Sequence, residues 1–183
     1  MTTSNRTQIR SLIAAGALLL ASQYSRAASY YVAVNGSNTN PGTSASPFLT
    51  IQRGVDAAGP GDTVIVRDGN YSAGASINKA GSASAWITIK AEHKWKAVLN
   101  CSVSCHDLFG LGGSSAYIVI QDFDIGFTKN AGVFSNSGGG RNIRVLGNHI
   151  HDIGTGVYDS TPYGLMGVYT DASAANWTMS TPK

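Results

Sequence analysis

Four segments of the chain carry an apolar residue at every second position, which is typical of strands that bury one face. They are "TVIV" from 63, "WITI" from 86, "YIVI" from 117 and "NIRV" from 142. Superimposing them predicts two ladders of buried residues, Val64–Ile87–Ile118–Ile143 and Val66–Ile89–Ile120–Val145. Strand repeats 23, 31 and 25 residues apart, with a fifth start 34 residues later at Trp177, indicate a solenoid whose coils stack their apolar sides.

One helical pattern precedes these repeats. In "TIQRGVDAAG" the apolar residues Ile51, Val55 and Ala58 fall on one helical face, so we expect a helix over 51–58. Thr50 is the expected cap of its start and Gly59 of its end. The first coil of a solenoid exposes an apolar end and unpaired backbone groups. We interpret the helix as the cap that covers them.

Composition supports an all-β chain, since 22 of 183 residues are glycine and only 13% are charged, against about 25% in average globular domains. Residues 1–27 have the pattern of a secretory signal peptide, with an apolar stretch at 11–21 and cleavage expected after Ala27. The apolar stretch is too short for a membrane anchor. We therefore expect a secreted or periplasmic protein with no membrane partner after cleavage.

Removal of this leader changes the charge of the chain. Three of the thirteen basic residues lie within it, Arg6, Arg10 and Arg26, and the remaining ten balance ten acidic residues. A neutral chain without a basic stripe is a poor match to nucleic acid, which we exclude as a partner. The two cysteines, Cys101 and Cys105, are predicted to form a local disulfide in an exported protein, the alternative being two buried thiols.

The segment "YYVAVNGSNTNPGTSASPFLTIQRGVDAAGPGDTVIVRDGNY" resembles the N-terminal opening of secreted right-handed parallel β-helix proteins of the pectate-lyase-like superfamily, and "NIRVLGNHIHDIGTGVY" resembles one of their coils. The resemblance implies an all-β, single-stranded right-handed parallel β-helix over 28–183. Its first part, 29–62, comprises a strand, a loop and the capping helix. About five coil starts follow over 63–183, with an incomplete C-terminal end that suggests a fragment.

The resemblance also implies a function. Many members are polysaccharide lyases, in which Asp side chains hold Ca²⁺ on an outer sheet face and a Lys or Arg removes a proton beside a uronate carboxylate. An extracellular polysaccharide is then the expected partner, and Arg144, outward on a strand, is the candidate base. The alternatives are a non-catalytic surface module that binds glycans and an inactive truncated chain.

Two patterns make candidate metal ligands. Asp122 and Asp124 flank the inward Phe123, so both are expected to point outward, where they could share a hard cation or, as we favour, be solvated turn residues. The assumed register also stacks an outer polar column in which imidazoles flank a carboxylate, an arrangement that suits Zn²⁺ or acid–base chemistry. A hydrogen-bonded surface ladder is the alternative that we favour. The column comprises Asn70, His93, Asp124, His149 and Lys183.

The turn "GNHIHDIG" adds a second reason to consider a metal. His149 and His151 face the same way if this segment is a strand, and Asp152 follows directly. Polar turns that pair along stacked coils are the structural interpretation of the same residues, and we favour it.

Overall fold

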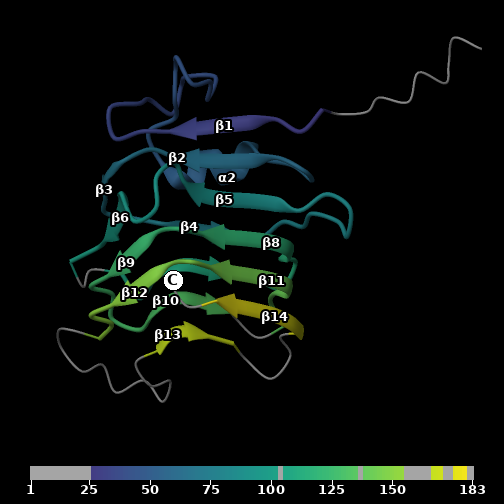
Figure 1. Ribbon diagram of the computed structural model, residues 1–183, viewed down its shortest axis with the longest axis vertical. Coiled ribbons are helices and arrows are strands. Elements are labelled where there is room, and N and C mark those ends of the chain that lie inside the picture. Colours follow the sequence, from purple (N-terminus) through teal and green to yellow (C-terminus); the bar gives the residue numbers. More distant parts are fainter. Residues whose placement is uncertain (1–25, 103–104, 136–137, 155–165, 171–174, 181–183) are drawn as a thin grey trace, which may run out of the picture.

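Three parallel sheets wind into one stack of coils, from β1 at one end to β13 and β14 at the other (Figure 1). The computed structural model describes residues 26–102, 105–135, 138–154, 166–170 and 175–180. Sheet A has the order β1-β2-β5-β8-β11-β14, sheet B β12-β9-β6-β3 and sheet C β13-β10-β7-β4. The elements are β1 (Ser29–Val32), α2 (Ile51–Ala57), β2 (Thr63–Val66), β3 (Gly69–Tyr71), β4 (Ala75–Ile77), β5 (Ile87–Ala91), β6 (Ala97–Asn100), β7 (Asp107–Leu111), β8 (Ala116–Gln121), β9 (Asp124–Gly126), β10 (Ala131–Ser135), β11 (Arg141–Leu146), β12 (His149–His151), β13 (Met166–Tyr169) and β14 (Ala175–Ser180).

From β2 to β13, each coil contributes one strand to each sheet, in the order A, B, C along the chain. Every pairing between the named strands is parallel. Inward side chains of successive coils meet in a continuous core, where Ile118 and Ile143 are fully buried and Ile87 is 1% exposed. The prediction of an all-β parallel β-helix with a short capping helix is therefore confirmed.

The predicted ladders are correct from the second coil onward. Ile87 lies beside Ile118, and Ile118 lies beside Ile143, which pairs in turn with Trp177. The predicted alignment of the first two strands of the ladder, β2 and β5, is wrong by two residues, because Val64 pairs with Ile89 and not with Ile87. The strand β5 has three buried inward positions, Ile87, Ile89 and Ala91, so either register buries Val64 and Val66 against apolar partners. A slip of two residues keeps every side chain on its face, and the apolar pattern cannot distinguish the two alignments.

The helix α2 covers the open end of the first coil, as predicted, and contacts β1, β2 and β4. Ile51, Gly54 and Val55 form its buried face. A Cβ atom at Gly54 would lie 2.7 Å from a Val64 methyl group and 3.0 Å from a Val32 methyl group, so only glycine lets the helix approach this closely. Thr50 caps the start by accepting a hydrogen bond from the Arg53 amide.

The end of α2 is capped differently from the prediction. The helix ends at Ala57, the backbone of the cap residue Ala58 is extended, and Gly59 donates its amide proton to the Asp62 carboxylate. Lys79, which follows β4, reaches back so that its ammonium group donates hydrogen bonds to the carbonyl groups of Val55, Asp56 and Ala58. The last carbonyls of a helix lack intrahelical partners and carry partial negative charge, and a cation satisfies both.

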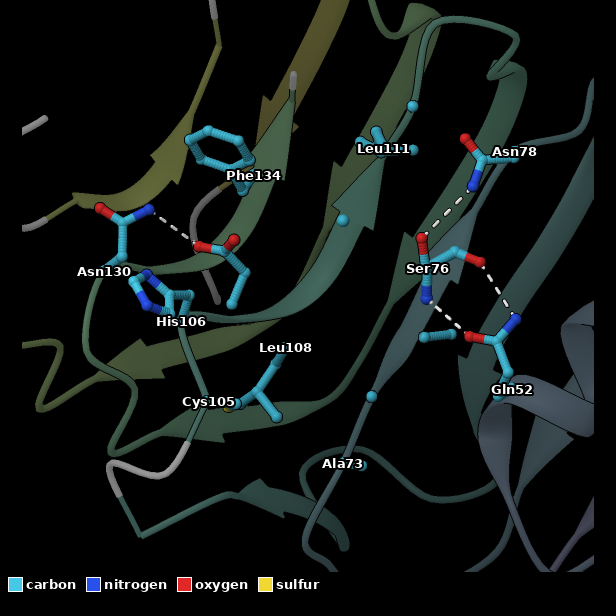
Figure 2. Close-up of a pocket in the computed structure, with 15 residues that line it drawn as sticks. Gln52, Ala73, Ser76, Asn78, Cys105, His106, Leu108, Leu111, Asn130 and Phe134 are labelled. Atoms are coloured by element: carbon cyan, nitrogen blue, oxygen red, sulfur yellow. Dashed lines mark hydrogen bonds between the residues drawn. The ribbon is translucent and has the colours of Figure 1, made fainter.

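Gln52 ties the same helix to the edge of sheet C. Its side-chain oxygen accepts a 2.8 Å hydrogen bond from the backbone N–H of Ser76, and its side-chain nitrogen donates a 3.1 Å hydrogen bond to the backbone carbonyl of Ser76 (Figure 2). Ser76 lies in β4, the edge strand of that sheet. A side chain that occupies edge backbone groups keeps them from pairing with another chain.

Within the stack, Asn148 joins two coils from inside. Its side chain is buried, accepts from the Phe123 amide and donates to the Ile120 carbonyl group, each at 2.9 Å. Phe123 and Asn148 occupy equivalent positions just before β9 and β12, and the amide bridge connects those two turns. The structure also joins Cys101 and Cys105 by a disulfide.

The leader predicted over 1–27 lies almost entirely outside the described residues, as does Lys183 at the end of the predicted polar column. Cleavage after Ala27 stays a prediction. Of the helices in the described part of the chain, none has the length and apolar character to cross a membrane.

Replacing Lys79 by methionine should destabilise the chain. The substitution keeps an unbranched side chain but removes the charge that satisfies three carbonyl groups at the end of α2. We expect the free energy of unfolding to fall by about 1–2 kcal/mol, measured by urea denaturation. Lys90→Met, on the outer face of β5, is the matched control and should change it little. Equal losses in the two variants would contradict the capping role.

Candidate functional site

An open groove of about 750 Å³ lies on the outer face of sheet C, across β4, β7 and β10 (Figure 2). Phe134, Asn130 and His106 lie at one side of it, and Gln52, Ser76 and Asn78 lie at the other. Asp107 also lines it, and no lysine or arginine is among its described lining residues.

The groove results from a missing side chain in an outer row. Ser76, Gly110, Phe134 and Tyr169 are aligned across β4, β7, β10 and β13. A Cβ atom at Gly110 would meet nothing within 4 Å, so the floor of the groove is open there. Beyond it the rings of Phe134 and Tyr169 stack with their centroids 4.9 Å apart. A polar residue and an aromatic residue therefore stand on either side of a gap one strand wide.

Asp107 is the acidic group of the groove. It is the first residue of β7 and pairs with the buried Ala131, so its side chain is only partly exposed at the groove wall. Burial raises the pKa of its carboxyl group above the ordinary value of 3.8. The hydrogen bond from the Asn130 side chain, 2.9 Å long, and the nearby His106 oppose that rise.

A second group of polar side chains lies on the outer face of sheet B. Asp124 in β9 pairs in register with His149 in β12, and His151 follows two positions later on the same face. The Asp124 carboxylate lies 3.1 Å from Nδ1 of His149 and 2.8 Å from Nε2 of His151. The two imidazole rings stack with centroids 4.5 Å apart. We call these three residues the His–Asp–His cluster.

Asp152 completes the surroundings of this cluster. Its carboxylate lies 2.7 Å from Nδ1 of His151. The hydrogen bond to Asp152 is the largest cause that raises the pKa of His151, and the bond to Asp124 adds to it against the opposing effect of burial. Both ring nitrogens of His151 therefore face carboxylates.

His93 is not part of this cluster, and its predicted place in the column is wrong. Val98 takes that place, since Asn70 pairs with Val98 and Val98 with Asp124. His93 instead contacts Asp68 at 3.0 Å. The predicted residue, His93, lies five positions before the observed one, Val98. Two of these positions come from the register of β5 on β2. The other three come from a longer turn, because Ala97 follows Ala91 by six positions, whereas Gly69 follows Val66 by three.

Two further candidates lie apart from both sites. Asp122 accepts a hydrogen bond from the neighbouring Gln121 side chain at 2.7 Å and is not in the group of three metal-ligand residues. Arg144 is on the outer face of sheet A, where its guanidinium lies 4.0 Å from the centre of the Trp86 ring. It does not line the groove on sheet C, and its role as a base stays a prediction.

The family model for the Pel9A-like right-handed β-helix region matches residues 30–175 of this sequence. The chain belongs to this Pel9A-like family. The match runs from β1 to the first residue of β14, and it confirms the resemblance to pectate-lyase-like β-helix proteins.

Individual relatives are longer than this chain. The uncharacterized protein YwoF of Bacillus subtilis (strain 168) is 25% identical over 146 residues, which are 73% of this chain and 31% of YwoF. Three solved structures share the fold. A rhamnogalacturonan lyase has a TM-score of 0.59 and 17% identity, and the match covers 83% of this chain and 50% of that one. A GH136 lacto-N-biosidase from Eubacterium ramulus has a TM-score of 0.64 and 18% identity, with 85% of this chain and 31% of that one covered. Pectate lyase Pel9A has a TM-score of 0.57 and 18% identity, with 85% of this chain and 47% of that one covered. The chain thus spans half or less of each.

Ca²⁺, which the resemblance to lyases implies, does not fit the groove or the His–Asp–His cluster of this Pel9A-like chain. The ion takes six to eight oxygen ligands. The groove offers one carboxyl group, that of Asp107. The His–Asp–His cluster offers one carboxylate and two nitrogen ligands.

Sequence reasoning missed the groove and placed only part of the cluster. The strands of sheet C are short and mostly apolar, and the alignment of coils rested on sheet A. A signal was present, since "DLFGL" and "AGVFS" place Gly110 and Phe134 in equivalent positions. The sequence aligned Asp124 with His149 and placed His149 and His151 on one face, but it did not combine the three residues into one cluster.

The raised pKa of Asp107 predicts a pH-dependent loss of stability. The folded chain keeps this proton at pH values where the unfolded chain, with a pKa near 3.9, has lost it. The free energy of unfolding therefore decreases as the pH rises from that value through the folded-state pKa. Asp107→Asn keeps an acceptor for Asn130 but cannot ionise. It should melt at a higher temperature than the unchanged chain at pH 7 and at the same temperature near pH 3.

Thermal melts from pH 3 to 8 would check this, with Asp56→Asn, an exposed carboxyl group on α2, as the control. A difference between Asp107→Asn and the unchanged chain that stays constant with pH would show that burial of Asp107 has no such effect.

Proposed function

We propose that this chain binds a polysaccharide outside the cell and that the groove on sheet C holds it. The observation that carries the proposal is the gap at Gly110, between Ser76 on one side and the stacked Phe134 and Tyr169 on the other. Strands are about 4.8 Å apart, so two spacings separate Ser76 from Phe134, which leaves room for a sugar ring. Membership in the Pel9A-like family supports a carbohydrate ligand.

The groove has the chemistry that carbohydrates need. Sugars present hydroxyl groups around their edges and C–H groups on their faces, so they bind to side-chain amides and to aromatic rings. Asn78 and Asn130 supply amides at the two sides of the groove, and Phe134 supplies a ring held in place by Tyr169. With one carboxyl group and no cation among its described lining residues, the groove favours a section of glycan rich in hydroxyl groups.

Elimination at a uronate residue is the second candidate function. Two structures that share the fold are named as lyases, which favours it. The reaction needs a base beside the uronate carboxylate and a positive charge to neutralise that carboxylate. His106 and Asp107 are the groups in the described groove that exchange protons, and Arg144 would have to act from another sheet. Glycoside hydrolysis generally uses two carboxyl groups, and the described lining has one.

Action outside the cell rests on the leader at 1–27. Export of the chain should yield a mature protein that starts at Ala28, which N-terminal sequencing would check. A product that retains Met1 through Ala27 would contradict the proposal of secretion.

Filling the gap at Gly110 should weaken glycan binding and leave the backbone as it is, because a Cβ atom there meets nothing within 4 Å. We expect Gly110→Phe and Phe134→Ala each to weaken binding at least about tenfold. The measurement is calorimetric titration against a panel of oligosaccharides from pectate, rhamnogalacturonan, alginate and neutral plant and bacterial glycans. Thr88→Phe, which adds the same ring to the outer face of sheet A, is the matched control and should bind like the unchanged chain.

Two outcomes decide between the candidates. Absorbance of an unsaturated sugar in the near ultraviolet during incubation with pectate or rhamnogalacturonan would favour elimination, and binding without turnover would favour a binding module. The proposal as a whole is wrong if the unchanged chain binds no member of the panel, or if Gly110→Phe binds as tightly as the unchanged chain does.

A further inference from the structure

The His–Asp–His cluster has no place in the proposed glycan groove, since it lies on sheet B and the groove lies on sheet C. We propose that Asp124, His149 and His151 form a binding site for a transition-metal ion, and that Zn²⁺ is the ion it prefers. The site joins two successive coils, because Asp124 lies in β9 and both histidines lie in β12.

The positions of the ligand atoms suit a small tetrahedral ion. The three ligand atoms all lie within 4.8 Å of one another, and the carboxylate oxygens are 3.1 Å and 2.8 Å from the two imidazole nitrogens. Bonds of about 2.0–2.1 Å to a tetrahedral ion place neighbouring ligands about 3.3 Å apart. The two distances from Asp124 are already close to this spacing, and rotation of the stacked imidazole rings would have to bring their nitrogens to it as well.

The ligand types select among metals. Two imidazole nitrogens and one carboxylate oxygen suit Zn²⁺ and its neighbours in the first transition row, whereas Ca²⁺ and Mg²⁺ require oxygen ligands. Three protein ligands leave a fourth position for water. The side chain of His149 is 49% exposed, so an ion can enter from solvent.

The surroundings hold one ligand in the orientation that metal binding needs. Metal-bound histidines usually donate their second ring N–H to a carboxylate, which fixes the tautomer and the ring orientation. His151 has this partner in Asp152, 2.7 Å from its Nδ1, so its Nε2 is directed to the site. Two aromatic rings border the site. The ring centroids of Trp95 and His149 are 5.6 Å apart, and those of Phe127 and His151 are 5.9 Å apart. Trp95 is fixed by a hydrogen bond from its indole N–H to the Gly147 carbonyl group.

Backbone pairing contributes to this arrangement. His149 and His151 are two positions apart on one strand, so their side chains share a face. The register of β12 on β9 places Asp124 directly opposite His149. An ion held by all three residues would link the coils from outside, on the same pair of coils that Asn148 links from inside. Binding to the folded chain alone would then raise its stability.

Titration of the chelator-treated chain with ZnCl₂ would test the proposal. We expect one ion per chain and a rise in melting temperature with ZnCl₂, and no comparable effect of CaCl₂ or MgCl₂. His149→Ala and Asp124→Asn should lower the affinity for Zn²⁺ more than tenfold. Asp152→Asn removes no ligand and should lower it by about 10–100-fold, as expected for a partner of a ligand. His93→Ala removes an exposed histidine outside the cluster and should leave the affinity unchanged.

Substitution with CoCl₂ gives a second measurement that does not depend on stability. Tetrahedral coordination by nitrogen and oxygen should produce visible absorption that His93→Ala retains and that Asp124→Asn, which preserves the size of the side chain, loses. The proposal is overturned if ZnCl₂ binds His149→Ala and Asp124→Asn as tightly as the unchanged chain, if only CaCl₂ binds, or if neither titration detects an ion.

Discussion

Each coil of this chain can remove its apolar side chains from water only by stacking on the next coil. The strands are three to six residues long, and none could bury an apolar face alone. Parallel backbone pairing and the ladder through Ile87, Ile118 and Ile143 supply the two parts of that stacking. The first coil has no predecessor, which explains why α2 packs over it and why Lys79 and Gln52 satisfy backbone groups of the cap and of the neighbouring edge strand.

The register that builds the core also arranges the surface. Side chains alternate between faces, so a fixed alignment of inward residues fixes the outward rows as well. On sheet C this aligns Ser76, Gly110, Phe134 and Tyr169, and the absence of one side chain opens the groove. On sheet B it sets Asp124 opposite His149. Neither feature requires an irregular loop.

This dependence explains how far the sequence predicts the structure. Alternation and repeat length identify the fold, and from Ile87 onward the predicted ladders agree with the observed pairing. The register of β2 on β5 was not predictable, since a shift of two residues retains apolar contacts for Val64 and Val66. The surface column failed at His93, because the length of the turn before Ala97 depends on local backbone conformation that apolar periodicity does not report. The pairing of Asp124 with His149 was predictable because β8 to β9 and β11 to β12 have turns of equal length.

The two sites are also linked to stability through this register. A polysaccharide in the groove would contact β4, β7 and β10, and a metal ion would join β9 to β12, so each ligand would contact more than one coil. A chain with a slipped coil would separate the contacting residues and lose the ligand. A ligand that binds only the aligned stack stabilises that alignment in proportion to its own binding. In a fold whose local elements are individually weak, ligands that bridge coils therefore act on the same equilibrium as the core ladders and the cap.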